Sequence, residues 1–288
     1  WCECNKEKTE KTDLPECKIP ALTDKVKPGS TAYIGTSNWS DFGTAAADSK
    51  VVYANPNTDF IITTSDKGTV DNEFNKTGKG IGIQKIKMMI APVSDGIYDE
   101  DTLSMIIDVE GDVVYDWTEI QKLLIANYGG WAKVPEMYKD YNANYTAKLS
   151  SFNLTDGETY VAYAKVTDKE DNSSYIRTAE FVYDATKPAV EVTGNFNAAE
   201  NTYCEQAVIK VTEETDYTIT VDGVAIDHAT ISHKYTITGE GMRKVVVTDK
   251  AGNKVTTYFT VLKEHNKVAY NQAATCLNAG FTSERCLN

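Results

Sequence analysis

Histidine is scarce in this chain, and the familiar catalytic motifs are absent. Only 3 of the 288 residues are histidines, and there is no Gly-x-Ser-x-Gly elbow, His-Glu-x-x-His pair or phosphate-binding loop. His228 and His233 lie in or beside one segment between strands, where surface polar residues are expected. Carboxylate pairs such as 213–214 are common in so acidic a chain and do not indicate a glycosidase. We therefore expect no catalytic residues and no enzyme activity.

The chain also lacks an excess of positive charge and any long apolar run. The 42 acidic residues outnumber the 29 basic ones, and this balance repels phosphate backbones and disfavours nucleic-acid partners. No apolar run approaches the roughly 20 residues that a membrane helix needs, so we expect no membrane insertion in this segment. The hydrophobic content of 41% is that of a folded protein, and the length allows two domains with cores of their own.

One seven-residue motif, which we call the phrase, is present twice. Val-Thr-Asp-Lys-x-x-Asn begins at Val166 and again at Val247, 81 residues later. Each copy lies between two runs of alternating apolar residues, and an Asp- or Asn-rich turn between such runs is typical of a β-hairpin. The spacing matches the length of one sandwich domain. The repeat predicts an all-β fold of two β-sandwiches in tandem, with the phrase as the turn between the last two strands of each.

The domain limits follow from the strand patterns. The first sandwich is predicted at 28–185 and a compact second one at 186–263, because Pro188 cannot donate to a central ladder and marks a boundary. Asp222-Gly223 is a strong hairpin turn in the second. Cysteine-bearing segments at 1–27 and 264–288 flank the pair. Strands of the first sandwich are expected at 31–35, 59–64, 78–90 (with a bulge) and 174–183.

Residues 99–145 break the β rhythm and are predicted to be a part-helical insertion in the first sandwich. Asp99 can cap a helix with apolar residues at 103, 106 and 107, and a second helix is expected at 117–125, with 120, 123 and 124 on one face. The insertion is rich in aromatic rings, which suit sugar faces and protein hot spots alike. The alternative is that the rings form a small core of the insertion. The candidate binding residues are Trp117, Tyr128, Trp131, Tyr138 and Tyr141.

Several stretches are similar to a known family. The run from Tyr160 to Pro188 and the stretches at 34–42, 218–224 and 247–253 resemble tandem bacterial immunoglobulin-like domains. These domains occur in very large surface proteins of anaerobic Firmicutes, particularly gut species. The resemblance covers roughly residues 28–263. The two tails look like halves of a cysteine-containing repeat found beside such domains.

The resemblance implies an immunoglobulin-like fold for both sandwiches and an extracellular place on a Gram-positive cell, with attachment to the cell wall through parts outside this chain. It implies a non-enzymatic stalk that displays a host ligand, as an adhesin does. The alternative is a dedicated binding module for a host glycan or a host protein, such as mucin or immunoglobulin, through the aromatic insertion. We expect the segment to be monomeric within a longer chain.

No cofactor or metal is expected. Asp168 and Asp249, in the two copies of the phrase, lie where tandem domains can share calcium, but capping of their turn explains them without an ion. Lys85, Lys87 and Lys165 are candidates, by strand position alone, for a Lys–Asn isopeptide crosslink. The cysteines favour disulfides over zinc, since those near the N-terminus lack a firm fourth ligand, and their pairing stays open. They are Cys2, Cys4, Cys17, Cys204, Cys276 and Cys286.

Overall fold

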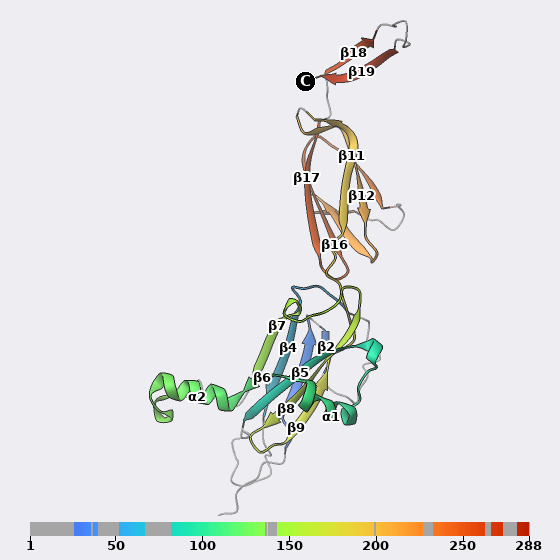
Figure 1. Cartoon of the computed structure of the whole chain (residues 1–288). Coiled ribbons are helices and arrows are strands. Elements are labelled where there is room, and N and C mark those ends of the chain that lie inside the picture. The colour runs from blue at the N-terminus through green and yellow to red at the C-terminus, as the bar shows by residue number, and fades with distance from the viewer. Residues whose placement is uncertain are drawn as a thin grey trace, which may run out of the picture.

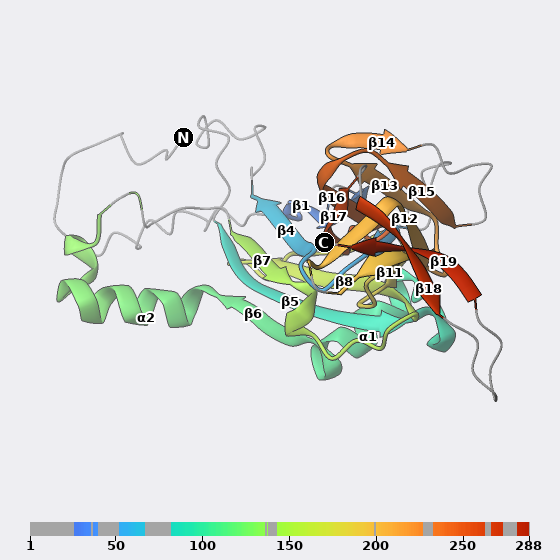
Figure 2. The same ribbon diagram turned by 90° about the horizontal axis from the view of Figure 1, so that it is seen from above.

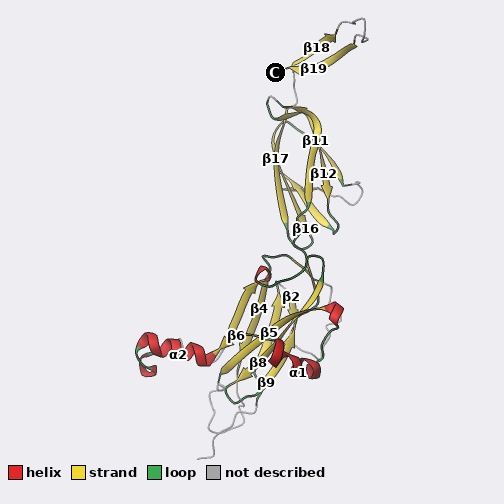
Figure 3. Ribbon diagram, viewed as in Figure 1, coloured by secondary structure: helices red, strands yellow, loops and turns green. Residues whose placement is uncertain are grey.

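Two β-sandwiches follow one another along an elongated molecule (Figure 1). The structure is a computed structural model and describes residues 26–35, 37–39, 52–66, 82–135, 137, 143–198, 200–226 and 233–262, and the backbone of 266–272 and 281–287. Strands dominate, and the α-helices in these ranges belong to the first sandwich (Figure 3). The all-β fold class is as predicted. None of the described helices is long and apolar enough to cross a membrane.

The first sandwich packs a smaller sheet against a larger one. Its strands are β1 Gly29–Ile34, β2 Ser37–Trp39, β3 Val52–Ala54, β4 Asp59–Ser65, β5 Ile83–Pro92, β6 Asp112–Asp116, β7 Asn144–Lys148, β8 Thr159–Asp168, β9 Ser173–Arg177 and β10 Phe181–Tyr183. One sheet has the order β2-β1-β4-β7 and the other β3-β10-β8-β5-β6, with β9 also on β8. Alternate residues point inward, so Phe60 and Ile62 of β4 are buried with Phe181 of β10 in one core.

Helix α1, Glu100–Glu110, covers the outer face of the larger sheet. The Asp99 carboxylate caps it by accepting a 2.8 Å hydrogen bond from the Thr102 amide. Leu103 and Ile107 recur four residues apart, so both lie on one face. They are fully buried in a small second core with Tyr163 of β8. The predicted helix and its cap are confirmed.

The rest of the insertion differs from the expectation. Strand β6 runs between the helices and extends the larger sheet beside β5. Helix α2, Trp117–Tyr128, then begins at its cap Asp116, ends at Gly129 with a left-handed φ of 70°, and points away from the sheet in both views (Figures 1 and 2). The face predicted to be apolar is not buried against the sheet, since Leu123 is 65% exposed. Short 3-10 turns lie at Val93–Asp95, Trp131–Lys133 and Leu149–Ser151.

The strand predicted at 174–183 is two strands, β9 and β10. Between them Thr178 exchanges hydrogen bonds with Ala162, its hydroxyl accepting at 3.0 Å and its amide donating at 2.8 Å, so a side chain replaces one rung of the ladder. The first phrase therefore turns between β8 and β9, and β10 follows it. The expectation that it joins the last two strands is wrong for this domain. The bulge predicted in β5 is confirmed, between Ile83 and Lys85.

The second sandwich is simpler. Its strands are β11 Ala189–Asn197, β12 Thr202–Thr212, β13 Tyr217–Val221, β14 Val224–Ile226, β15 Lys234–Thr238, β16 Gly241–Asp249 and β17 Lys254–Leu262. Strands β11, β12 and β15 pair together, as do β17, β16, β13 and β14, and a short parallel contact of β12 with β17 joins the two groups. Inward residues such as Ile209 and Val247 fill the core between them. The predicted turn at Asp222-Gly223 is present, with φ of 52° and 85°.

A hairpin that the sequence did not predict lies near the C-terminal end. Its strands are β18, Asn266–Gln272, and β19, Phe281–Leu287, and Cys286 stands opposite Lys267 in its register. Cys204 is buried in the second sandwich. Four cysteines lie outside the described residues, so the disulfide prediction stays open. These are Cys2, Cys4, Cys17 and Cys276.

Candidate functional site

The segment 184–188 joins the sandwiches, and the second phrase of the repeat binds to it. The side-chain amide of Asn253 donates to the backbone oxygens of Asp184, at 2.9 Å, and Thr186, at 3.1 Å. Asn253 itself is buried. These two bonds tie the β16–β17 turn of the second domain to the chain leaving the first.

Two further contacts cross the junction from strand β3 and the residue that follows it. The side-chain amide of Asn55 in the first domain donates to the backbone oxygen of Ala251 at 2.8 Å. The Lys250 ammonium lies 4.2 Å from the centre of the Tyr53 ring, within the range of a cation–π interaction. The turn at 249–253 is thus held from both sides, by the linker and by the end of the first sandwich.

The aspartates of the two copies of the phrase differ in their hydrogen bonds. Asp168 is fully buried and both of its oxygens are used: one accepts from the amides of Glu170 and Asn172, and the other from the Asn172 side chain at 2.7 Å. Asp249 accepts from the Asn253 amide at 2.8 Å through Oδ1. Because the Asn253 side chain turns to the linker instead, Oδ2 of Asp249 is buried without a hydrogen-bond partner among the described residues.

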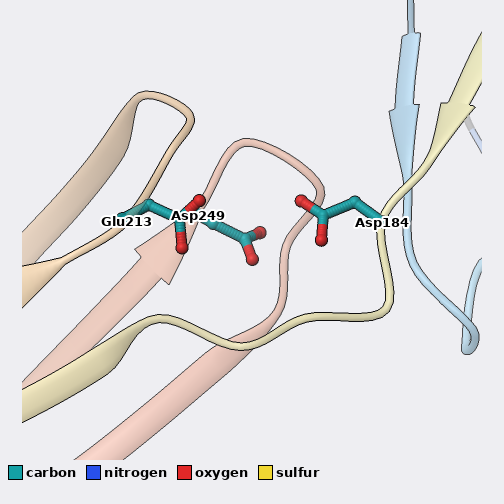
Figure 4. Close-up of side chains that lie close together, drawn as sticks. All are labelled: Asp184, Glu213 and Asp249. Atoms are coloured by element: carbon teal, nitrogen blue, oxygen red, sulfur yellow. The ribbon is translucent and has the colours of Figure 1, made fainter. Parts of the chain in front are cut away.

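Two other carboxylates lie close to that of Asp249. Oxygens of Asp184, Glu213 and Asp249 lie within 4.8 Å of one another, with Asp184 in the linker and the other two at strand ends of the second domain (Figure 4). Within the part of the chain that the structure describes, this is the one group of acidic, cysteine or histidine side chains close enough to hold a metal ion. Asp168 is not part of it.

The remaining hydrogen bonds fix the other two carboxylates from one side. Oδ1 of Asp184 accepts from the Thr186 amide at 3.1 Å. Oε1 of Glu213 accepts from the amide of Thr215, at 3.0 Å, and from its hydroxyl, at 2.9 Å. Each acid therefore has one oxygen anchored by its neighbouring backbone, and the arrangement is held without any bond between the carboxylates.

The cluster concentrates negative charge. Burial, and then the nearby charge of Asp249, raises the pKa of the Asp184 carboxyl above its usual value. Two unit charges at 4.8 Å repel by roughly 3–4 kcal/mol at an effective dielectric constant of about 20. Among the described residues no lysine or arginine makes an ion pair with any of the three. Within the described part of the chain, no ion pair offsets this repulsion.

A pocket of about 470 Å³ opens beside the cluster. Asp184 and Glu213 line it together with Asp156, Tyr53 and the exposed Lys187. Asp156 accepts hydrogen bonds from the Thr186 hydroxyl and the Ala185 amide, and these bonds lower its pKa, so it is ionised and adds to the negative charge. The pocket gives solvent and small ions access to the carboxylates of Asp184 and Glu213.

The aromatic residues predicted to bind a ligand are only partly brought together. Trp117 is buried, and its ring meets that of Trp131 edge-on at 5.9 Å, with the Lys169 ammonium 4.4 Å from the Trp117 ring centre. Trp117 thus packs within the insertion, which favours the core alternative for this residue. Tyr128 is 37% exposed at the end of α2. Tyr138 and Tyr141 lie outside the described residues.

The other candidates have ordinary polar partners. Lys85 pairs with Asp116, while Lys87 and Lys165 both pair with Asp108. His233 lies 2.8 Å from the Tyr217 hydroxyl through Nδ1, and His228 is outside the described residues. The described lysines thus have ion-pair partners and His233 a hydrogen-bond partner, and the isopeptide crosslink stays a prediction.

Comparison with known proteins yields a distant structural likeness. No family model matches the chain, and no curated protein matches it. Among solved structures, fibronectin(III)-like modules of CbhA from Clostridium thermocellum align with 12% sequence identity and a TM-score of 0.35, covering 81% of this chain and 94% of that one. At that distance the likeness supports no argument about function, and the sandwich fold rests on the strand pairing itself.

Proposed function

We propose that this chain is a non-enzymatic spacer in an extracellular protein of the bacterial cell surface, in which two sandwiches are held end to end. The supporting observation is the junction: Asn253 bonds two linker oxygens, and Asn55 and Lys250 contact across the same boundary. A flexible tether needs no such contacts, whereas a spacer gains reach when its domains keep a fixed orientation.

Replacing Asn253 with alanine should loosen the junction without unfolding the second domain. Two hydrogen bonds to the linker are lost, worth about 1–2 kcal/mol together, while the backbone bond to Asp249 remains. In NMR relaxation measurements we expect the two domains of the wild type to share one rotational correlation time. In the variant, the smaller second domain should tumble faster than the first.

The chain supplies a matched control for this test. Asn172 occupies the same place in the first copy of the phrase, but its side chain bonds Asp168 within its own turn. Asn172→Ala should therefore leave the common correlation time unchanged. Independent tumbling in the wild type, or an equal effect of both substitutions, would refute the spacer proposal.

A second role, display of a host ligand, is favoured by the exposure of α2. This helix projects from the sandwich, with Leu123 65% and Ile125 39% exposed beside Tyr128. Exposed apolar and aromatic side chains on a projecting element suit a host glycan or a host protein such as mucin or immunoglobulin.

A glycan array and capture from host secretions test this role. Any ligand found should lose at least tenfold in affinity when Leu123→Ser and Trp131→Ala are combined. Tyr258→Ala, which removes an aromatic ring that is 58% exposed on the second domain, should leave it unchanged. A ligand that still binds the Leu123→Ser, Trp131→Ala variant but not Tyr258→Ala would show that the binding site lies outside the insertion.

A further inference from the structure

We propose that Asp184, Glu213 and Asp249 form a calcium site between the domains, with the linker supplying one ligand and the second sandwich two. The three carboxylates converge within 4.8 Å from segments that are far apart in the sequence (Figure 4). The inference deepens the proposed spacer function and rests on it for its biological meaning, because an ion held by both parts would fix the orientation that the spacer needs.

The buried oxygen of Asp249 is the observation that points to a ligand. Asp249 is 5% exposed, and its Oδ2 has no hydrogen-bond partner among the described residues. Buried carboxylate oxygens are normally satisfied, and an exception calls for an explanation such as an ion. Asp168 shows that the same phrase can satisfy both oxygens, through the side chain of Asn172. In the second copy the equivalent side chain bonds the linker, so Oδ2 does not receive this bond, and the Asp249 carboxylate lies in one group with the other two acids.

The charge of the site favours a cation over a shared proton. Three carboxylates meet, the ionised Asp156 lies on the same pocket, and no described lysine or arginine pairs with the three. One proton would neutralise one charge of the group. A divalent ion neutralises two and is attracted by all three, so it relieves the mutual repulsion more completely.

The ligand atoms select the kind of ion. All are carboxylate oxygens, with no sulfur or imidazole nitrogen among them, so hard cations are preferred over zinc or copper. Calcium accepts six to eight oxygens in flexible geometry, and the open pocket can supply water for the remaining positions. Magnesium demands near-ideal octahedral geometry and gives up its water reluctantly, so three carboxylates from separate segments suit calcium better.

Calorimetric titration of the full chain with calcium, after treatment with a chelator, tests the site at pH 7.5. We expect one ion to bind with a dissociation constant of about 0.1–1 mM, the range of extracellular modules. Asp249→Asn, Asp184→Asn and Glu213→Gln should each weaken binding at least tenfold. These changes keep an oxygen for every backbone hydrogen bond that the acids now accept, so the variants should fold.

Glu214 provides the matched control, since it lines the same pocket next to Glu213 but lies outside the cluster. Glu214→Gln should change calcium affinity less than twofold, and magnesium should bind at least tenfold more weakly than calcium. Absence of calcium binding up to about 10 mM, which is tenfold above the expected range, would overturn the proposal. So would binding that survives the three substitutions, or equal affinity for magnesium.

The site and the spacer can fail separately. If the domains tumble together in chelator and no calcium binds, the spacer stands and the ion site is wrong. If calcium binds through these three acids while the domains still tumble independently, the ion site stands and the spacer is wrong. Both proposals are supported if calcium slows the relative motion of the two domains in the wild type but not in Asp249→Asn.

Discussion

Replacing Phe60 with alanine should lower the melting temperature of the first domain by about 10 °C and leave that of the second domain unchanged. Phe60 is fully buried, and its ring meets those of Tyr145 and Phe152 edge-on, both at 6.3 Å. Truncating such a ring costs about 3–5 kcal/mol, through lost burial and the cavity left behind. In a domain of this size each kcal/mol shifts the melting temperature by about 2–4 °C.

Tryptophan fluorescence can follow the first domain selectively, because all 4 tryptophans lie at or before residue 131. Calorimetry in chelator then reports both domains. Val113→Ala, at a side chain that is 51% exposed, should shift neither transition by more than about 2 °C. Phe259→Ala, at a buried ring of the second core, should shift the transition that fluorescence does not see. A shift of both transitions by Phe60→Ala would mean that the two cores do not unfold separately.

Local patterns were enough to predict much of the fold. Alternation of apolar residues located β4 and the strands of the second sandwich. Asp99 marked a helix start through its capping carboxylate, and Asp222-Gly223 marked a turn through their backbone conformation. The predictions were wrong where the local structure depends on a residue that is distant in the sequence. Strand β6 exists because β5 offers it an edge, and the predicted strand at 174–183 is interrupted because Thr178 bonds Ala162.

The carboxylate cluster could be predicted only in part. Asp249 was a calcium candidate from its place in the repeated phrase, but so was Asp168, and the sequence treats the two alike. What separates them is the direction of one asparagine side chain, which depends on the linker oxygens within reach of Asn253. Asp184 and Glu213 join the cluster through folding of segments 29 and more residues apart, which no local pattern encodes.

The two aspartates of the repeated phrase should therefore respond differently to alanine. Asp168→Ala should lower the free energy of unfolding of the first domain by about 3 kcal/mol, because three donors lose a buried, charged acceptor. Asp249→Ala removes one such bond but also relieves the repulsion with Asp184 and Glu213. In chelator these terms oppose each other, so the second domain should stay within about 1 kcal/mol of the wild type.

Urea unfolding, followed by tryptophan fluorescence for the first domain and by far-UV circular dichroism for the second, measures both effects. Asp168→Asn is the control for charge: it keeps one acceptor oxygen and should recover part of the loss. Calcium should add a loss at Asp249 and so narrow the difference between the two positions, since an ion bound to the native state stabilises the wild type but not Asp249→Ala. Equal losses at both positions in chelator would mean that Oδ2 of Asp249 has a partner in solution, and the argument for an ion at the junction would fail with it.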